Sequence, residues 1–209
     1  MFVLALDTAT PSLTVGVVDL DPHAPHAATV LAQRGQTNSR GHAEVLTPFI
    51  LECLAETGVA RADLGAVIVG CGPGPFTGLR VGMATAAAFG DALGIEVHGV
   101  CSLDAIGVGG DGDVLVLTDA RRREVYWARY ADGVRTAGPG VCAPAEFGLD
   151  GDWRAATVDG GGARVLAEGA PTPATLAAVG APLIGTPPRP LVPLYLRRPD
   201  AVEMAFRGA

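Results

Sequence analysis

The segment Val67–Gly90, VIVGCGPGPFTGLRVGMATAAAFG, constrains the fold of this chain more than any other part of the sequence. It begins with three β-branched residues that stop at Gly70 and continues through glycines interleaved with prolines. Spacing compatible with a helix begins at Leu79. This order predicts a strand, a tight turn and a helix, and the rest of the chain is interpreted as support for that unit.

A glycine-rich turn that leads into a helix can bind phosphate, because it offers free backbone N–H groups beside the positive end of the helix dipole. Here Pro73 and Pro75 remove two of those donors, and no lysine is present in the chain to complete a P-loop. The spacing from Gly72 through Gly74 to Gly78 also misses the dinucleotide fingerprint by one residue. A structural turn is favoured over a phosphate site, and both interpretations stay open.

The helix that follows has one face of very small residues, because Gly82, Ala86 and Gly90 recur at every fourth position. A glycine inside a helix costs about 1 kcal/mol relative to alanine, so we expect something to pack very closely against this face. Two candidates are open: the chain's own sheet, or a helix of another chain.

A second helix is expected over about His42–Thr57, ending at Gly58. Its apolar residues cover more than one face, so its own sheet cannot account for all of them. Together with the small-residue helix, it resembles half of a helix bundle whose other half belongs to another molecule. The apolar positions are Ala43, Val45, Leu46, Phe49, Ile50, Leu51, Cys53 and Leu54.

Other turns contain groups that can bind phosphate. Asp7 and Thr8 end the predicted strand Phe2–Leu6, before a second strand over Leu13–Val18, and could hold a magnesium-bound phosphate or simply bond their own backbone. The loop from Asp159 through Gly161 has the same ambiguity. We expect further strands over 29–33, 96–100, 114–118 and 124–130, and short helices over 102–106 and 174–180.

Charge and composition limit the function. The chain has 209 residues, a net charge of −7 and a pI near 5.0, which disfavours a free-standing nucleic-acid binder. RNA contact is expected to be local or made beside a partner, and the consecutive residues Arg121, Arg122 and Arg123 are either a solvated turn or such a contact. No apolar run reaches membrane-spanning length and no basic signal region precedes Phe2, so a cytosolic protein is expected.

The four cysteines are widely spaced, which indicates neither a zinc site nor a disulfide framework. Cys71 follows a strand at a sharp turn, where a nucleophile could sit with His42 or His98 as its base. Free cysteine is more often simply buried, and that interpretation is favoured.

Five ordered segments resemble one family: LALDTAT, GHAEVLTP, GPGPFTGLRVG, DARRREVYW and PLYLR. They are similar to those of the TsaB proteins, formerly YeaZ, of bacterial tRNA threonylcarbamoyladenosine biosynthesis. The resemblance runs from Phe2 to about Arg198, with few matches between Trp153 and Pro190. It implies an α/β, actin/Hsp70/sugar-kinase-like (ribonuclease H-like) fold of two lobes, 1–100 and a smaller, partly degenerate 101–209, each a mixed sheet flanked by helices.

The resemblance also implies a function. TsaB proteins are non-catalytic subunits that bind and activate the catalytic paralogue TsaD, and with the ATPase TsaE they transfer threonylcarbamoyl to the adenosine 3′ of the anticodon. Contact with tRNA is expected only within that complex, and a homodimer is expected when TsaD is absent. Partner contacts in the family use the first two helices, here Ala43, Leu46, Phe49, Ile50, Leu54, Arg80, Gly82, Met83, Ala86, Ala87 and Gly90.

TsaD carries a His-x-x-x-His metal pair where this chain has Ser102 and Ile106, so the resemblance implies no metal and no catalytic residues. A degenerate nucleotide site is implied at Asp7, Thr8, Gly72, Gly74 and Gly161, with no cofactor required and ATP or ADP possible at the partner interface. Two alternatives are a stand-alone ATPase or kinase of this fold, and a peptidase that would need the missing metal pair or a working Cys71.

Overall fold

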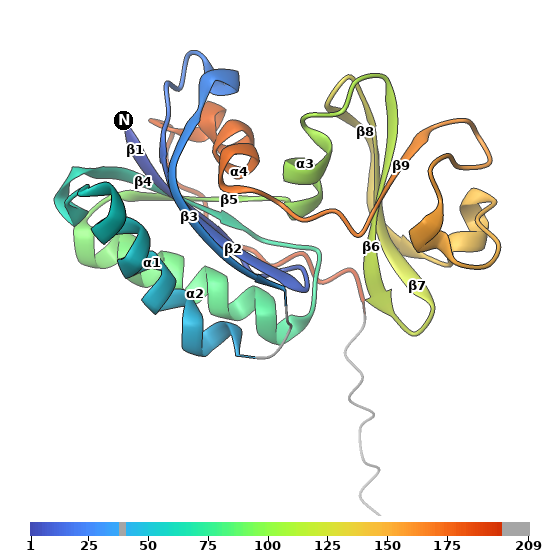
Figure 1. Ribbon diagram of the computed structural model, residues 1–209, viewed down its shortest axis with the longest axis horizontal. Coiled ribbons are helices and arrows are strands. Elements are labelled where there is room, and N and C mark those ends of the chain that lie inside the picture. Colours follow the sequence, from blue (N-terminus) through green and yellow to red (C-terminus); the bar gives the residue numbers. More distant parts are fainter. Residues whose placement is uncertain (38–40, 198–209) are drawn as a thin grey trace, which may run out of the picture.

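The computed structural model describes residues 1–37 and 41–197, which form two α/β lobes (Figure 1). The first sheet has the order β3-β2-β1-β4-β5. Its strands β1 and β2 form an antiparallel hairpin that continues antiparallel into β3, while β4 and β5 add parallel strands on the other side of β1. The strands are β1 (Phe2–Asp7), β2 (Ser12–Asp19), β3 (Thr29–Thr37), β4 (Leu64–Gly70) and β5 (Glu96–Val100).

Helices cover both faces of this sheet, which is why β1 and β4 are almost wholly apolar. On one face, Leu4, Leu6 and Val67 pack against α1 (His42–Thr57) and α2 (Phe76–Leu93). On the other, Val3, Ala5 and Ile68 pack against α4 (Pro173–Gly180). The predicted strand, turn and helix of Val67–Gly90 are confirmed, although the helix begins three residues earlier than expected, at Phe76.

The second sheet has the order β8-β7-β6-β9, with β6, β7 and β8 antiparallel and β9 parallel to β6. One of its faces packs against α3 (Ser102–Gly107), which lies between the two sheets in Figure 1. The other face is covered by Leu149, Trp153 and their neighbours. The strands are β6 (Asp113–Arg121), β7 (Glu124–Ala131), β8 (Val134–Cys142) and β9 (Arg164–Ala167). Short 3-10 turns occupy Pro25–Ala27, Arg61–Asp63, Pro144–Phe147, Trp153–Ala155 and Ala181–Leu183.

The expected division of the chain at residue 100 needs a correction. After β9 the chain returns to the first lobe, where Leu176, Ala177 and Ala181 complete the core on the face opposite α1 and α2. Without α4 this face of the first sheet would expose Val3, Ala5 and Ile68 to water. Residues 173–184 therefore belong to the first lobe by packing, although they follow the second sheet in sequence.

No helix among residues 1–37 and 41–197 is both long enough and apolar enough to cross a bilayer.

Candidate functional site

The turn after β1 and the glycine-proline turn after β4 are packed against each other. Thr8 joins them, because its Oγ1 donates to the carbonyl oxygen of Gly78 at 2.7 Å and accepts from the backbone N–H of Gly82 at 3.0 Å. A Cβ atom at Gly74 would overlap the carbonyl oxygen of Ala9. The two turns predicted to hold phosphate thus lie together, and close backbone contact explains the glycines.

Asp7 lies beneath these turns and is fully buried. Its carboxylate accepts the Ser102 hydroxyl hydrogen and the backbone N–H of Ala9, the latter at 2.8 Å. Ser102 is in turn fixed by Gly72, whose N–H donates to the hydroxyl at 3.1 Å and whose carbonyl oxygen accepts from the Ser102 N–H at 2.7 Å. Desolvation raises the pKa of Asp7 to about 6, against the lowering effect of its hydrogen bonds with Ser102 and Ala9.

These contacts hold the predicted nucleotide residues of the first lobe against other groups of the same chain. Asp7, Thr8, Gly72 and Gly74 are brought together, as expected, but all four are buried. The Gly72 N–H and the Thr8 hydroxyl each already have a partner within the chain. This arrangement can stabilise the junction of β1, β4 and α3, but it does not present these groups to a ligand.

Gly161 is not part of that cluster. It lies in a loop beside the face of the second sheet that is turned away from α3 (Figure 1). The N–H groups of Gly161 and Ala163 donate to Asp159 Oδ1 at 2.9 and 2.8 Å, and Arg129 pairs with the other carboxylate oxygen. Burial alone would raise the pKa of Asp159, but the bonds from Ala163, Arg129 and Gly161 together hold it below its ordinary value. The backbone donors of this loop are thus bonded to a carboxylate of the chain itself.

The small-residue face of α2 packs on the chain's own sheet. A Cβ at Gly82 would overlap Thr8 Oγ1, and one at Gly90 would overlap Val97 of β5. Of the two open candidates, the chain's own sheet is the one that covers this face. Seven of the expected partner residues are therefore buried within this chain, which is a correction to their assignment: Leu46, Ile50, Leu54, Gly82, Met83, Ala86 and Gly90.

The sides of α1 and α2 that point away from the sheet are exposed and rich in small residues. We call this surface the outer helical face, and of the expected partner residues it retains Ala43 and Ala87, with Phe49 half-buried at its edge. Leu51 lies on it with 41% of its side chain exposed. Its members are Ala43, Thr47, Leu51 and Ala55 of α1 and Ala84, Ala87, Ala88 and Ala92 of α2.

Arg80 lies near the start of α2 in an aromatic cluster that the sequence did not predict. Its guanidinium carbon is 3.8 Å from the ring centre of Phe76, and its Nε donates to the Tyr195 hydroxyl at 3.1 Å. Phe76 and Tyr195 are stacked. The segment PLYLR carries a family resemblance, but no local pattern in the sequence connects it with the start of α2.

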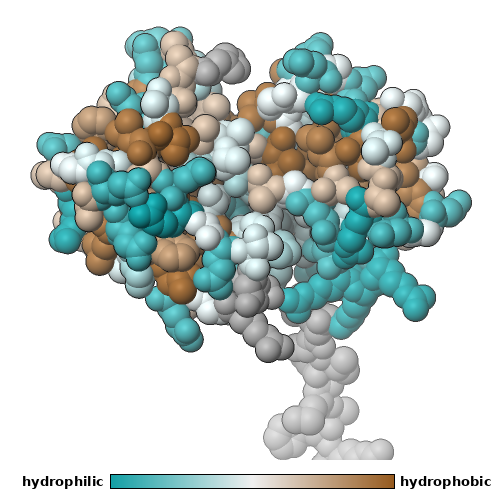
Figure 2. All heavy atoms as spheres, viewed as in Figure 1, coloured by the Kyte–Doolittle hydropathy of each residue, from teal (hydrophilic) through white to brown (hydrophobic). Residues whose placement is uncertain are grey.

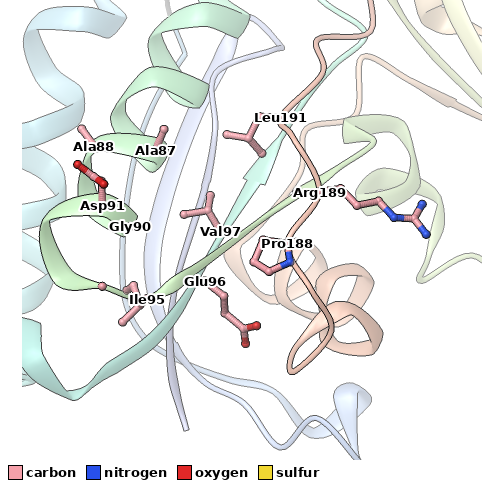
Figure 3. A pocket seen from close by; sticks show the side chains of 11 residues that line it. Ala87, Ala88, Gly90, Asp91, Ile95, Glu96, Val97, Pro188, Arg189 and Leu191 are labelled. Carbon is pink, nitrogen blue, oxygen red and sulfur yellow. The ribbon is translucent and has the colours of Figure 1, made fainter.

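An open groove of about 730 Å³ lies between the second half of α2, β5 and residues 188–191 (Figure 3). Ala87, Ile95, Val97 and Leu191 make much of its wall apolar. The Glu96 carboxylate is already bonded to the Gly185 N–H at 3.1 Å, and Arg189 points away from the groove in Figure 3. The groove therefore assembles no set of reactive groups.

The two remaining alternatives, a catalytic cysteine and a metal site, concern residues close to the end of β4 and to α3. Cys71 is buried, and desolvation, followed by the nearby Asp7 carboxylate, raises its pKa to about 12, so its thiolate is scarce at neutral pH. Across residues 1–37 and 41–197, no group of three or more His, Cys, Asp or Glu side chains is arranged to hold a metal ion. The Ser102 hydroxyl donates to the Asp7 carboxylate, and Ile106 packs with the core of the second lobe.

Comparisons with known proteins agree with the fold. Residues 30–159 match the family model described as TsaD, tRNA N6-adenosine threonylcarbamoyltransferase. An uncharacterized protein of Mycobacterium tuberculosis is 54% identical over 97% of this chain and 95% of its own length. The tRNA threonylcarbamoyladenosine biosynthesis protein TsaB of Escherichia coli is 36% identical, over 62% of this chain and 55% of that protein.

The chain is also similar to a crystal structure from Pseudomonas aeruginosa, of an uncharacterized protein described as similar to the peptidase YeaZ. That structure superimposes with a TM-score of 0.74 at 26% identity, covering 94% of this chain and 99% of the other. The two-lobed arrangement described above is thus shared along nearly the whole length of both proteins.

Proposed function

The chain belongs to the TsaB (YeaZ) family, and on this premise we propose that it is a non-catalytic subunit of the machinery that makes threonylcarbamoyladenosine in tRNA. A role in this biosynthesis follows from the family. The finer statement, that the chain supports catalysis by another subunit, is our proposal. Its catalytic partner would be TsaD, acting with the ATPase TsaE.

The observation that carries this proposal is that the polar groups of the Asp7 turn are hydrogen-bonded within the chain. In a phosphoryl-transfer enzyme, a carboxylate and backbone donors must face the phosphates and their magnesium ion. Here Asp7, Thr8 and Gly72 bond to Ser102, Gly78 and Gly82 instead. These contacts support a structural role for the turn, with no nucleotide required for the fold. A nucleotide bound in the complex would then lie at the partner interface, as ATP or ADP.

The outer helical face is the surface we assign to the partner. Alanines at 84, 87 and 88 allow the backbone of an opposing helix to come close, and Leu51 offers exposed apolar area for burial. The same surface would be self-complementary in a homodimer when TsaD is absent. We place this assembly, and its contact with tRNA, in the cytoplasm.

Omission and substitution test the proposal together. Removing the chain from a mixture of TsaD, TsaE, threonylcarbamoyl-adenylate and tRNA should stop modification. Ala84→Arg, at an exposed position of the outer helical face, should abolish co-elution with TsaD on a sizing column while leaving the unfolding midpoint unchanged, because a buried charge at the interface would lack a partner.

The matched control is Ala145→Arg, which makes the same exchange at an exposed alanine of the second lobe and should co-elute normally. Modification that continues without the chain, or ATP hydrolysis by the chain alone in the presence of magnesium, would instead support the stand-alone ATPase or kinase.

A further inference from the structure

Three consecutive arginines with an unusual backbone conformation lie where β6 turns into β7: Arg121 is the last residue of β6, and Arg122 and Arg123 form the turn. Arg121, Arg122 and Arg123 are all exposed, and their φ angles are 63°, 51° and 64°. Tight hairpin turns with positive φ normally use Asn, Asp or Gly, because a side chain is strained in this region. Arginines thus occupy positions where Gly, Asn or Asp would cause less backbone strain. Strained backbone positions of this kind are typical of functional sites.

Two carboxylates beside this turn, Asp119 and Glu124, form ion pairs with arginines from other parts of the chain. Asp119 accepts the backbone N–H of Arg121 at 2.7 Å through one oxygen and pairs with Arg154 at 3.3 Å through the other. Glu124 pairs with Arg197 at 3.1 Å. Around the turn, cationic side chains outnumber carboxylates, although the chain as a whole carries a net charge of −7.

Two stacked aromatic rings lie exposed at the start of α2. Phe76 is 52% exposed and Tyr195 is 41% exposed, and their ring centres are 5.1 Å apart with 23° between the planes. Arg80 contacts both side chains. Exposed aromatic rings held in place beside an arginine are the usual components of a base-stacking surface.

The C-terminal segment joins these two features. Tyr195 is two residues before Arg197, whose guanidinium donates to the carbonyl oxygen of Ala120 at 2.6 Å, at the base of the arginine turn. The Cα atoms of Tyr195 and Arg197 can be at most roughly 7 Å apart, so the aromatic cluster lies close along the chain to a residue that contacts the base of the turn. The turn lies at the lower edge of the second lobe in Figure 1, where Figure 2 shows projecting hydrophilic side chains.

We propose that this arginine–aromatic surface, made of Phe76, Arg80, Arg121, Arg122, Arg123 and Tyr195, binds RNA. The arginines contact backbone phosphates, whose geometry matches the guanidinium fork, and the rings stack on an unpaired base. An acidic protein surface would use the arginines but would not need the exposed rings, so RNA fits both features. The inference rests on the proposed function only where it identifies this RNA as tRNA. It assigns Arg80 to contact with RNA rather than to contact with the protein partner.

A titration of the chain with a fluorescein-labelled single-stranded RNA, followed by anisotropy, tests this inference. Replacing all three turn arginines (Arg121→Gln, Arg122→Gln, Arg123→Gln) should weaken binding at least tenfold at low salt. It should also reduce the slope of log K against log salt by about 2, since each phosphate contact on a single strand contributes about 0.7. Phe76→Ala should weaken binding by about fivefold or more and leave that slope unchanged, because it removes stacking and no charge.

The matched control is Arg61→Gln, an exposed arginine at the opposite end of β4, which should bind RNA like the unaltered chain. Equal RNA binding by the triple variant and Arg61→Gln would overturn the inference. It would also be overturned if polyglutamate displaced the RNA while Phe76→Ala had no effect, because the surface would then recognise acidic protein.

The same variants separate this inference from the proposed function. The triple variant should still co-elute with TsaD, since none of its altered residues lies on the outer helical face. If the unaltered chain failed to bind TsaD, the proposed function would fail, while the titration of the chain alone would still decide whether the surface binds RNA.

Discussion

Asp7 is a carboxyl group that this fold keeps away from water, and the consequence is a measurable pH dependence of stability. Burial raises its pKa from 3.8 to about 6, so between about pH 4 and pH 6 Asp7 is protonated in the folded chain but ionised in the unfolded chain. The raised pKa therefore adds to the free energy of unfolding below about pH 4, and this contribution is lost as the pH rises through 6. The change for this one group is on the order of 2–3 kcal/mol.

Asp7→Asn should therefore remove part of the pH dependence of unfolding, because the amide has no proton to lose in this range. The measurement is the free energy of unfolding in urea between pH 4 and pH 7, for the unaltered chain and the variant. Relative to Asp7→Asn, the unaltered chain should lose stability across that interval. Asp19→Asn, which changes an exposed carboxylate at the end of β2, is the matched control and should follow the unaltered chain. Parallel curves for Asp7→Asn and the unaltered chain would contradict the raised pKa.

Among the helices and strands, α2 shows which structural features the sequence predicts and which it does not. The recurrence of Gly82, Ala86 and Gly90 correctly predicted a closely packed helix face, since a spacing of four residues defines one side of a helix. It could not identify the surface opposite, because Thr8 and Val97 reach that face from distant parts of the chain. The bond from Ser102 to Asp7 was missed for the same reason, since 95 residues separate the two.

The orientation of α2 makes a sharp prediction about its alanines. Ala86 has no exposed surface, so Ala86→Leu should overpack the interface with the sheet and lower the free energy of unfolding by about 1–3 kcal/mol. Ala84 is exposed two residues earlier, and Ala84→Leu should change stability by less than about 0.5 kcal/mol. Urea unfolding of the two variants measures the difference. Equal stability of the two would mean that Ala86 does not face the sheet.

At the scale of the whole molecule, the last described segment connects the two lobes. Leu191 packs against the core of the first lobe, and Leu196 against the core of the second. Between them, the Leu194 N–H donates to the carbonyl oxygen of Cys71 at 2.9 Å, at the end of β4. A short stretch of irregular chain therefore contributes to both cores, and we expect it to couple their unfolding.

Leu196→Ala should uncouple the lobes by weakening the second one. Both tryptophans of the chain, Trp127 and Trp153, lie in the second lobe, so fluorescence reports its unfolding while far-UV circular dichroism reports both lobes. In the unaltered chain the two signals should change together, as expected for one cooperative transition. In Leu196→Ala the fluorescence midpoint should fall below the dichroism midpoint, with a loss of about 1–2 kcal/mol for a half-buried leucine. Val192→Ala shortens a neighbouring exposed side chain and should leave both midpoints unchanged, so a shift of equal size in the two variants would mean that this segment does not connect the cores.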